Sequence, residues 1–351
     1  MKNKIEDNTE AEFAQNDCRP TKTYFSERKQ QMIKVTDVAY ARFAAPELDL
    51  MEAFLLDYGL TRQRRDDDTL YMRGTGPDHH IHITHLADEP GFIGMAFNAA
   101  SMADLEKFSQ VDGASAGEEM DEPGGGYRVR ITDPNGFQVE TIFGQATVAP
   151  LPVNELIGPD HGPGHPRDRD IQRAQMIPCP VMRLGHVVLN VPDCNIMDAF
   201  YRSHFGFLQS DICYVPGSDD DLAVAFQRCD KGKAYVDQHT LLFTKSKVLG
   251  LGHIAFEVED INALFVGHEL LKSKGYEHSW GIGRHTPAAN IFDYWFDNYG
   301  NRVEHFYGGD LLNVDDETRT HQLDGILESQ WGAQLSDRRA SLKTDYDPLT
   351  A

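Results

Sequence analysis

The sequence predicts an α+β fold of four βαβββ modules that pair into two domains. Two observations lead to this prediction. Two long stretches of the chain resemble each other in order and spacing, and each stretch contains two repeats of a strand, a helix and short strands. The chain of 351 residues is long enough for two domains of typical size. We expect these domains over residues 34–147 and 181–310.

Three pairs of segments establish the duplication. In the first pair, VAYARFAAPELDLMEAFL (38–55) aligns without a gap on LGHVVLNVPDCNIMDAFY (184–201). The other two pairs follow in the same order, residues 94–105 with 253–264 and residues 133–144 with 297–308. The separation of partners along the chain grows from pair to pair, as insertions in loops would cause. The chain is therefore an internal repeat, and each half helps to interpret the other.

In the second domain each module is expected to begin with a strand and a capped helix. LGHVVLNV (184–191) is rich in β-branched and apolar residues, which favours a strand, and LGHIAFEV (251–258) repeats the pattern. Asp193 and Asp260 follow these strands as the expected helix N-caps. Gly275 stands where a C-terminal cap is expected.

The two helices and the strands after them follow from spacing. Helical periodicity places one apolar set on one side of each helix, namely Ile196, Met197, Phe200 and Tyr201 in the first and Ile261, Leu264, Phe265 and Leu271 in the second. Short segments of strand character come next, for example residues 221–228, 239–245, 290–297 and 302–308. Each module is therefore expected to contain one strand, one helix and three further strands.

Three segments are expected to lie outside the domains. Residues 1–33 form a polar N-terminal extension, and residues 148–180 form a linker rich in proline, glycine and charge. Residues 311–351 form a C-terminal tail, which is polar from about residue 318 and is expected to be poorly structured. The first thirty residues contain no apolar core, so we expect no signal peptide.

Composition limits the partners and the compartment. The net charge of −22 disfavours nucleic acid and anionic membrane surfaces, and we expect neither as a partner. No apolar segment has the roughly 18 residues of a transmembrane helix. Five scattered cysteines without a CxxC pair argue against a disulfide framework and indicate a cytoplasmic location.

The duplication selects a few of the fifteen histidines. His186 and His253 lie in corresponding strands of the two modules of the second domain, and Glu304 lies in its last strand. Their counterparts in the first domain are Tyr40, Gly94 and Glu140. A structural role would tend to persist in both copies, whereas one copy is enough for a metal site. Two imidazoles and one carboxylate on separate strands are typical of a non-haem Fe(II) site with open positions, and they also suit Mn(II).

The stretch from His186 to Gly308 resembles the catalytic half of type I extradiol ring-cleavage dioxygenases of the vicinal oxygen chelate superfamily. The resemblance is greatest to the two-domain enzymes that act on 2,3-dihydroxybiphenyl and related catechols, and it covers about residues 34–310. The motifs that carry it are LGHVVLNV, DQHTLLF, GLGHIAFEVED and GRHTPAANIFDYWFDNYGNRVEHFYG. It implies two tandem vicinal-oxygen-chelate barrels, of which the second binds the metal and the first is a degenerate copy.

The resemblance also implies an activity and a site. The expected reaction inserts both atoms of O₂ into a substituted catechol and opens the ring beside the two hydroxyls, in the breakdown of aromatic compounds. The implied metal ligands are His186, His253 and Glu304, with Fe(2+) favoured over Mn(2+). The implied catalytic residues are His239, as the acid–base group, with His285 and Tyr294 as hydrogen-bond partners of the substrate. A homo-oligomer is also implied.

The substrate pocket follows partly from strand alternation. Residues two apart share a face of a strand, so Val188 is expected beside His186 and Ala255 beside His253. Pro287, in an uncharged loop, and Phe292 are further expected pocket residues. An apolar neighbour such as Val188 suits a hydrophobic ring substituent. Arg302 shares strand parity with Glu304, and both a salt bridge and a substrate contact remain open for it.

Other features are interpreted as structural. The run HHIHITH (79–85) resembles a metal cluster, but alternation along a strand places His80 and His82 on one face and His79 and His85 on the other. His80 is also the counterpart of His239, so a shared structural role for these two histidines stays open. His305 is expected to point away from the site. His161 and His165 are four residues apart, as two metal ligands on a helix would be, but the glycine and proline between them prevent a helix.

Two alternatives remain for the function. A glyoxalase-type isomerase or an epimerase on the same fold would use four protein ligands and a carboxylate base. A ligand-binding protein on this fold would lack the metal triad. The separate set of His239, His285 and Tyr294 favours the dioxygenase over both, and the fold alone would not separate the three.

Overall fold

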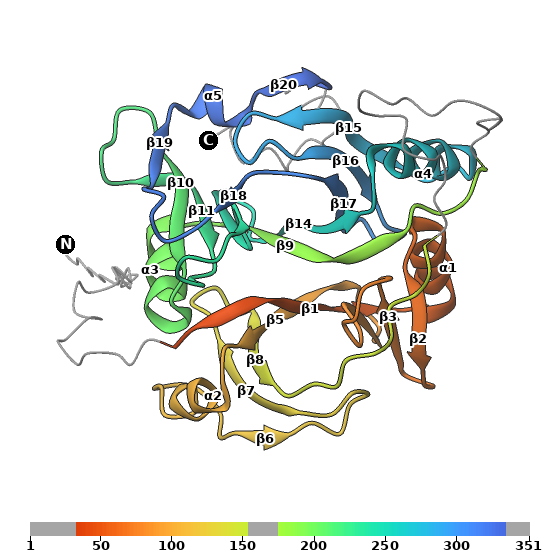
Figure 1. Ribbon diagram of the computed structural model, residues 1–351, viewed down its shortest axis with the longest axis horizontal. Coiled ribbons are helices and arrows are strands. Elements are labelled where there is room, and N and C mark those ends of the chain that lie inside the picture. The colour runs from red at the N-terminus through yellow and green to blue at the C-terminus, as the bar shows by residue number, and fades with distance from the viewer. Residues whose placement is uncertain (1–32, 154–174, 335–351) are drawn as a thin grey trace, which may run out of the picture. The chain divides into compact units, whose positions relative to one another are not determined.

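The computed structural model describes residues 33–153 and 175–334 (Figure 1). The expectations for residues 1–32, for His161 and His165 and for residues 335–351 lie outside the described residues. Within the described part, no helix is long and apolar enough to cross a bilayer.

The first half of the chain forms an eight-stranded sheet with the order β2-β3-β4-β1-β5-β8-β7-β6. Its two modules meet where β1 pairs with β5. In chain order its elements are β1 (Val35–Ala45), α1 (Leu48–Tyr58), β2 (Thr61–Arg65), β3 (Thr69–Arg73), β4 (His82–Leu86), β5 (Gly91–Ala99), α2 (Met102–Phe108), β6 (Glu118–Glu119), β7 (Tyr127–Thr132) and β8 (Gln138–Phe143). This is the expected pair of βαβββ modules.

The second half repeats this plan in a ten-stranded sheet with the order β19-β10-β11-β13-β9-β14-β17-β16-β15-β20. Its module elements are β9 (Val181–Val191), α3 (Cys194–Phe205), β10 (Leu208–Tyr214), β11 (Leu222–Arg228), β13 (Leu241–Lys245), β14 (Gly250–Val258), α4 (Ile261–Ser273), β15 (His278–His285), β16 (Ile291–Phe296) and β17 (Arg302–Tyr307). A short extra strand, β12 (Val236–Asp237), pairs with β18 (Leu311–Leu312). The predicted α+β class with four modules is confirmed.

Strand register confirms the duplication residue by residue. At the centre of the second sheet, Ala255 of β14 pairs with His186 of β9 on one side and with Glu304 of β17 on the other. At the centre of the first sheet, Ala96 of β5 pairs in the same way with Tyr40 of β1 and Glu140 of β8. The counterparts assigned from the sequence therefore occupy equivalent positions.

The expected helix caps are present. The carboxylate of Asp193 accepts a hydrogen bond from the Ile196 N–H at 3.0 Å, and that of Asp260 accepts one from the Ala263 N–H at 2.7 Å. Each bond satisfies one of the backbone donors that a helix start leaves without intrahelical partners. Gly275 follows α4 with φ +80°, a left-handed conformation that favours glycine after a helix.

The predicted apolar helix faces are partly wrong. Met197 and Tyr201 of α3 are buried, as are Leu264 and Leu271 of α4. Ile196 and Phe265, by contrast, are exposed. Each of these two is sequence-adjacent to a buried residue, and a one-residue step turns the side chain by about 100° around the helix axis. Only part of each expected apolar stripe therefore faces the sheet.

The expectation of an unstructured segment from about residue 318 is wrong for its first part. Residues Arg319–His321 form β19, which pairs with β10 at one edge of the second sheet, and Ser329–Gly332 form β20, which pairs with β15 at the other edge (Figure 1). A short helix, α5 (Leu323–Leu327), lies between them in the sequence. These strands are short and polar, and their pairing defines them more than their side chains do.

The two halves share one hydrophobic core, which includes Phe97 of β5 and Phe205 of α3. Their rings lie 5.6 Å apart, between centroids. Two buried hydrogen bonds also connect the halves. Tyr201 donates its hydroxyl proton to Asp133 at 3.0 Å, and the Nε2 of His305 donates to the carbonyl of Tyr58 at 2.8 Å. The second sheet is therefore positioned partly by packing against the first.

Candidate metal centre

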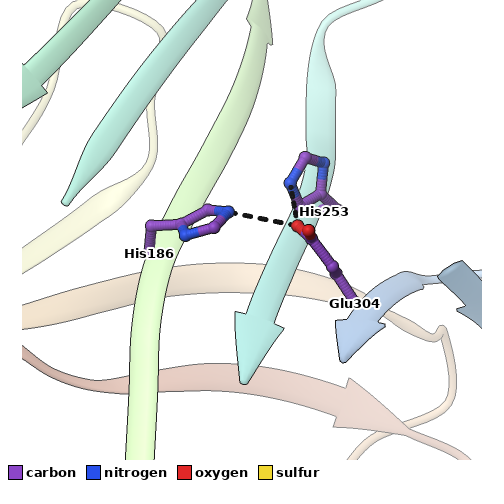
Figure 2. A group of neighbouring side chains, drawn as sticks. All are labelled: His186, His253 and Glu304. Carbon is purple, nitrogen blue, oxygen red and sulfur yellow. Dashed lines mark hydrogen bonds and ion pairs between the residues drawn. The ribbon is translucent and has the colours of Figure 1, made fainter. Parts of the chain in front are cut away.

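His186, His253 and Glu304 converge at the centre of the second sheet (Figure 2). They come from the adjacent strands β9, β14 and β17. Nε2 of His186 lies 3.2 Å and Nε2 of His253 lies 3.1 Å from the same oxygen, Oε2 of Glu304. The Glu304 side chain is fully buried and both imidazoles are largely buried. The sequence analysis selected these three residues, and the fold brings them together.

The donor set fits a divalent metal ion. Metal–nitrogen and metal–oxygen distances near 2.1 Å with a right angle between ligands separate the donor atoms by about 3 Å. Burial lowers the pKa of both His186 and His253 to about 3, so both imidazoles are neutral at physiological pH and can bind a metal. Asn290 donates from Nδ2 to Oε1 of Glu304 at 3.1 Å, which leaves Oε2 directed at the imidazoles.

The equivalent position in the first sheet contains an internal cation. Arg42 is the counterpart of Val188. Val188 pairs with His253, and Arg42 pairs with Gly94, the counterpart of His253. Its guanidinium donates to Oε2 of Glu140 at 3.1 Å from Nε and 3.0 Å from Nη2, and the hydroxyl of Tyr40 donates to the same oxygen at 2.5 Å. The carboxylate that persists in both halves is thus paired with an arginine side chain in the first half.

His239 lies directly beside the candidate metal ligands. Its ring centroid is 4.0 Å from that of His186, and its Nδ1 lies 2.6 Å from Oε1 of Gln238. The Nε2 of Gln238 donates to Asp211, which fixes the orientation of the Gln238 amide because a carboxylate only accepts. Nδ1 of His239 therefore carries a proton, and Nε2 is unprotonated in the neutral ring. Burial holds the pKa of His239 well below its usual value, so this neutral form prevails.

His285 and Tyr294 form a hydrogen-bonded pair on the other side of the centre. Nε2 of His285 lies 2.9 Å from the hydroxyl of Tyr294, and the rings of Tyr294 and His253 lie 5.0 Å apart in an edge-to-face arrangement. The guanidinium carbon of Arg302 lies 4.3 Å from the centroid of the Tyr294 ring, in cation–π geometry. Arg302 therefore faces the centre, as its strand parity with Glu304 predicted.

A cavity connects these groups. The expected catalytic residues His239, His285 and Tyr294 line it, as do Val188 and Pro287 of the expected pocket. Its further lining residues are His186, Asn190, Val224, Phe226, Leu242, Thr244, Gly252, His253, Trp280, Ala288, Asn290, Arg302 and Ile326.

Two expected pocket residues do not line this cavity. Ala255 is fully buried between its partners in the neighbouring strands β9 and β17. Phe292 is also fully buried, and its ring stacks on His285 with a centroid distance of 4.1 Å. The Phe292 ring also packs against Trp280, so it supports the cavity wall from behind.

The predicted face assignment in HHIHITH is wrong for one pair. The His80 ring lies 5.1 Å from that of Tyr40, whereas His82 stacks on Phe43 with a centroid distance of 4.6 Å. Tyr40 and Phe43 are an odd number of residues apart in β1 and so point to opposite faces. Alternation does not extend to His80, because β4 begins only at His82. The prediction that His305 points away from the site is confirmed by its contact with Tyr58.

Sequence reasoning missed two groups of polar residues. Asp211 and Gln238 orient His239, but nothing in the sequence indicates that β10 and the segment after β12 meet beside it. His268, His278 and Asp293 form a second cluster of potential ligands. Strand alternation could have shown that Asp293 and Tyr294 point to opposite faces of β16, but the contact with His268 depends on how α4 packs.

Comparisons with known proteins find similarity in the second half and over a longer range. Residues 183–305 match the family described as Glyoxalase/Bleomycin resistance protein/Dioxygenase superfamily. Over a longer range, the chain is similar to metapyrocatechase 2 of Cupriavidus necator, with 27% identity over 279 residues. That alignment covers 79% of this chain and 82% of the relative.

Solved structures are similar over almost the whole described part. A Mn(II)-bound glyoxalase from Novosphingobium aromaticivorans has a TM-score of 0.70 and 24% identity, covering 86% of this chain and 91% of its own. Homoprotocatechuate 2,3-dioxygenase from Arthrobacter globiformis has a TM-score of 0.68 and 19% identity, with coverage of 84% and 88%. The 2,3-dioxygenase LapB from Pseudomonas sp. KL28 has a TM-score of 0.68 and 22% identity, with coverage of 84% and 99%.

These likenesses agree with the strand order and with the repeated modules. The predicted tandem vicinal-oxygen-chelate fold is confirmed, since the similar structures match both halves together. The chain thus adopts this tandem fold, and residues 183–305 of its second half match the model of the Glyoxalase/Bleomycin resistance protein/Dioxygenase superfamily.

Proposed function

We propose that the protein is an extradiol dioxygenase that inserts both atoms of O₂ into a substituted catechol and opens the ring beside the vicinal hydroxyls. One observation carries the proposal: a His₂Glu triad lies at a cavity that its two histidines line together with three proton-handling residues, His239, His285 and Tyr294. The similarity to metapyrocatechase 2 and the fold shared with two ring-cleaving dioxygenases support it.

Fe(2+) is the metal that we propose for the triad, with Mn(2+) as the less favoured ion. Held by two imidazoles and one carboxylate, the ion would supply the redox chemistry that allows a catechol to react with O₂. His186 and His253 supply the neutral nitrogens and Glu304 supplies the charge that partly balances the ion.

His239 is the proposed acid–base residue. Its unprotonated Nε2 would accept a proton from a catechol hydroxyl and return it later in the reaction. The hydrogen bond from Nδ1 to Gln238 keeps the ring in the required tautomer throughout. A base of this kind needs an unprotonated nitrogen that faces the substrate. Because Nδ1 carries the proton of the neutral ring, Nε2 is that nitrogen.

His285 and Tyr294 are the proposed hydrogen-bond partners of the substrate oxygens. Their mutual hydrogen bond and the ring stack of Trp280, Phe292 and Tyr294 hold both groups in place before substrate arrives. Such fixed donors stabilise negative charge that develops on oxygen, at little reorganisation cost.

We further propose that the substrate carries an uncharged, apolar substituent. The part of the cavity wall that extends from Val188 includes a buried apolar cluster of Val224, Phe226, Leu242 and Ile326. A charged substituent placed against this wall would lose its hydration without gaining a partner. Alkyl- and aryl-substituted catechols fit this chemistry.

The isomerase alternative lacks support in the cavity. The fold is shared with a Mn(II)-bound glyoxalase, so the fold alone permits that chemistry. The expected isomerase site would have four protein ligands and a carboxylate base beside the substrate. Among the described residues that line the cavity there is no aspartate or glutamate, and Glu304 itself is turned toward the two imidazoles.

The domain boundaries and the cellular setting are also part of the proposal. Residues 181–310 would form the catalytic domain, and residues 34–147 a supporting domain. We propose a cytoplasmic enzyme that works as a homo-oligomer. Cys179, Cys194 and Cys229 are buried thiols, which suits a reducing compartment.

The decisive test is turnover by the reconstituted enzyme. The purified protein would be loaded with Fe(2+) without oxygen and then exposed to air with 3-methylcatechol or 2,3-dihydroxybiphenyl. We expect a yellow ring-opened product and matching oxygen consumption, both abolished in His186→Ala and Glu304→Gln. Glu140→Gln, which changes the counterpart carboxylate in the first half, is the matched control and should retain turnover. Fully metallated protein that consumes no oxygen with a panel of catechols would overturn the proposal.

A further inference from the structure

A second cluster of two imidazoles and one carboxylate lies outside the proposed active centre. It consists of His268 of α4, His278 of β15 and Asp293 of β16, whose potential ligand atoms all lie within 4.8 Å of one another. Nδ1 of His268 is 3.1 Å from each carboxylate oxygen of Asp293, and Nε2 of His278 is 2.8 Å from Oδ1. These separations match those in the first triad, where the corresponding distances are 3.2 and 3.1 Å.

The cluster lies on the opposite face of β16 from the active centre. Asp293 and Tyr294 are consecutive in this strand, so their side chains point to opposite faces. The Asp293 side chain is fully buried, whereas those of His268 and His278 are 16% and 32% exposed. An ion from solution could therefore reach the imidazole side of the cluster without passing through the active-site cavity.

The surroundings of Asp293 suit a bound cation. The indole N–H of Trp295 donates to Oδ2 of Asp293 at 2.6 Å and so orients the carboxylate from behind. Outer hydrogen bonds of this kind are typical of metal-binding carboxylates. A fully buried carboxylate is costly unless a positive charge faces it, and here that charge comes either from a proton on an imidazole or from a metal ion.

We propose that His268, His278 and Asp293 form a second metal site that binds a divalent transition-metal ion such as Zn²⁺. Two imidazole nitrogens and one carboxylate oxygen suit Zn²⁺, and also Ni²⁺ and Cu²⁺. The ion would connect α4, β15 and β16 on their outer side. On the inner side, β15 and β16 carry His285 and Tyr294, so the site would brace the strands that hold these two residues.

Metal counting on four full-length proteins tests this proposal. The proteins are the wild type, His268→Gln/His278→Gln, His186→Ala/His253→Ala and the combined quadruple variant. Each would be titrated with Zn²⁺ and, for its visible spectrum, with Co²⁺. We expect two ions per chain in the wild type, one in each double variant and none in the quadruple variant. Zn²⁺ should also raise the melting temperature of His186→Ala/His253→Ala but not that of the quadruple variant.

The readouts separate a metal site from a purely structural cluster. His204→Gln, which removes a histidine of α3 outside both clusters, is the matched control and should bind two ions. Circular dichroism and the melting temperature without metal establish that each variant is folded. If folded His186→Ala/His253→Ala protein binds no Zn²⁺ or Co²⁺ at millimolar concentration, the second site does not exist, and the cluster is a hydrogen-bond network only. This result would leave the proposed dioxygenase activity unaffected.

Discussion

The proposed role of His239 as a base depends on Gln238, a residue that does not line the cavity. A neutral imidazole has one protonated and one free nitrogen, and a neighbouring acceptor decides which is which. Here the acceptor is Gln238, whose amide is oriented by Asp211. Asp211 in turn accepts from Arg319 and His321 of β19, so β19 takes part in orienting His239.

Substitution of Gln238 should therefore impair turnover without impairing binding. In Gln238→Leu the acceptor at Nδ1 is lost, and the ring can adopt the tautomer with a protonated Nε2. We expect kcat to fall about 10- to 100-fold, with KM for the catechol nearly unchanged. Steady-state kinetics at matched iron content measure this effect.

A double-mutant cycle provides the control for this prediction. If Gln238 acts only through His239, then Gln238→Leu causes little further loss in a His239→Asn background. Equal losses in both backgrounds would instead mean that Gln238 has an independent structural role.

The buried imidazoles of the triad predict how metal binding depends on pH. Burial lowers the pKa of His186 and His253 to about 3, below the usual value near 6.5. A lowered pKa means that both rings are already neutral at pH 6, so an incoming ion displaces almost no protons. Calorimetric titration with Mn²⁺ in two buffers of different ionisation enthalpy counts these protons. Release of more than one proton per ion at pH 6 would show that the rings titrate normally.

At the scale of elements, the two central strand pairs show how one framework carries two different centres. In the second sheet the central carboxylate, Glu304, faces two imidazoles. In the first sheet its counterpart, Glu140, faces the guanidinium of Arg42, which extends from the position equivalent to Val188. A positively charged group can neutralise a buried carboxylate whether it is an ion or a side chain. In the first half the guanidinium of Arg42 thereby serves as the counterion of the buried carboxylate.

Removal of Arg42 should therefore be costly, and removal of both partners less so. Arg42→Met leaves a fully buried carboxylate without its main counterion, although Arg130 still donates to Glu140 at 3.2 Å. We expect a loss of about 3 kcal/mol in the free energy of unfolding. Arg42→Met/Glu140→Met should recover much of this loss, because no buried charge then remains unpaired. Urea unfolding of the two variants measures both effects, and a double variant less stable than the single one would contradict the explanation.

The sequence was sufficient for the repeated modules and for the triad but not for the added elements. LGHVVLNV and LGHIAFEV carry strong strand patterns, and the duplication aligned Glu304 with Glu140 correctly. By contrast, β19 and β20 are short and polar, and only their pairing with β10 and β15 makes them strands. Similarly, the predicted strand face of His80 was wrong because the sequence does not show where β4 begins. Sequence patterns therefore did not predict the contacts between distant segments.

At the scale of the whole molecule, the two halves are joined by shared packing. One hydrophobic core contains side chains of both sheets, and Phe97 of the first half lies against Phe205 of the second. The hydrogen bond from Tyr201 to Asp133 crosses the same boundary. Separation of the halves would expose this apolar surface to water, at a cost of about 25 cal/mol per Å². The described part should therefore unfold as one cooperative unit.

This expectation predicts that damage to the first half is felt in the second. All three tryptophans, Trp280, Trp295 and Trp331, lie in the second half, so tryptophan fluorescence reports on that half alone. Circular dichroism reports on both halves. In a two-state unfolding transition the two signals coincide at every urea concentration. Arg42→Met, a change in the first half, should then lower the midpoint of the fluorescence transition as much as that of the dichroism transition. An unchanged fluorescence midpoint would show that the halves unfold separately, and that the supporting half could be lost without unfolding the half that carries His186, His253 and Glu304.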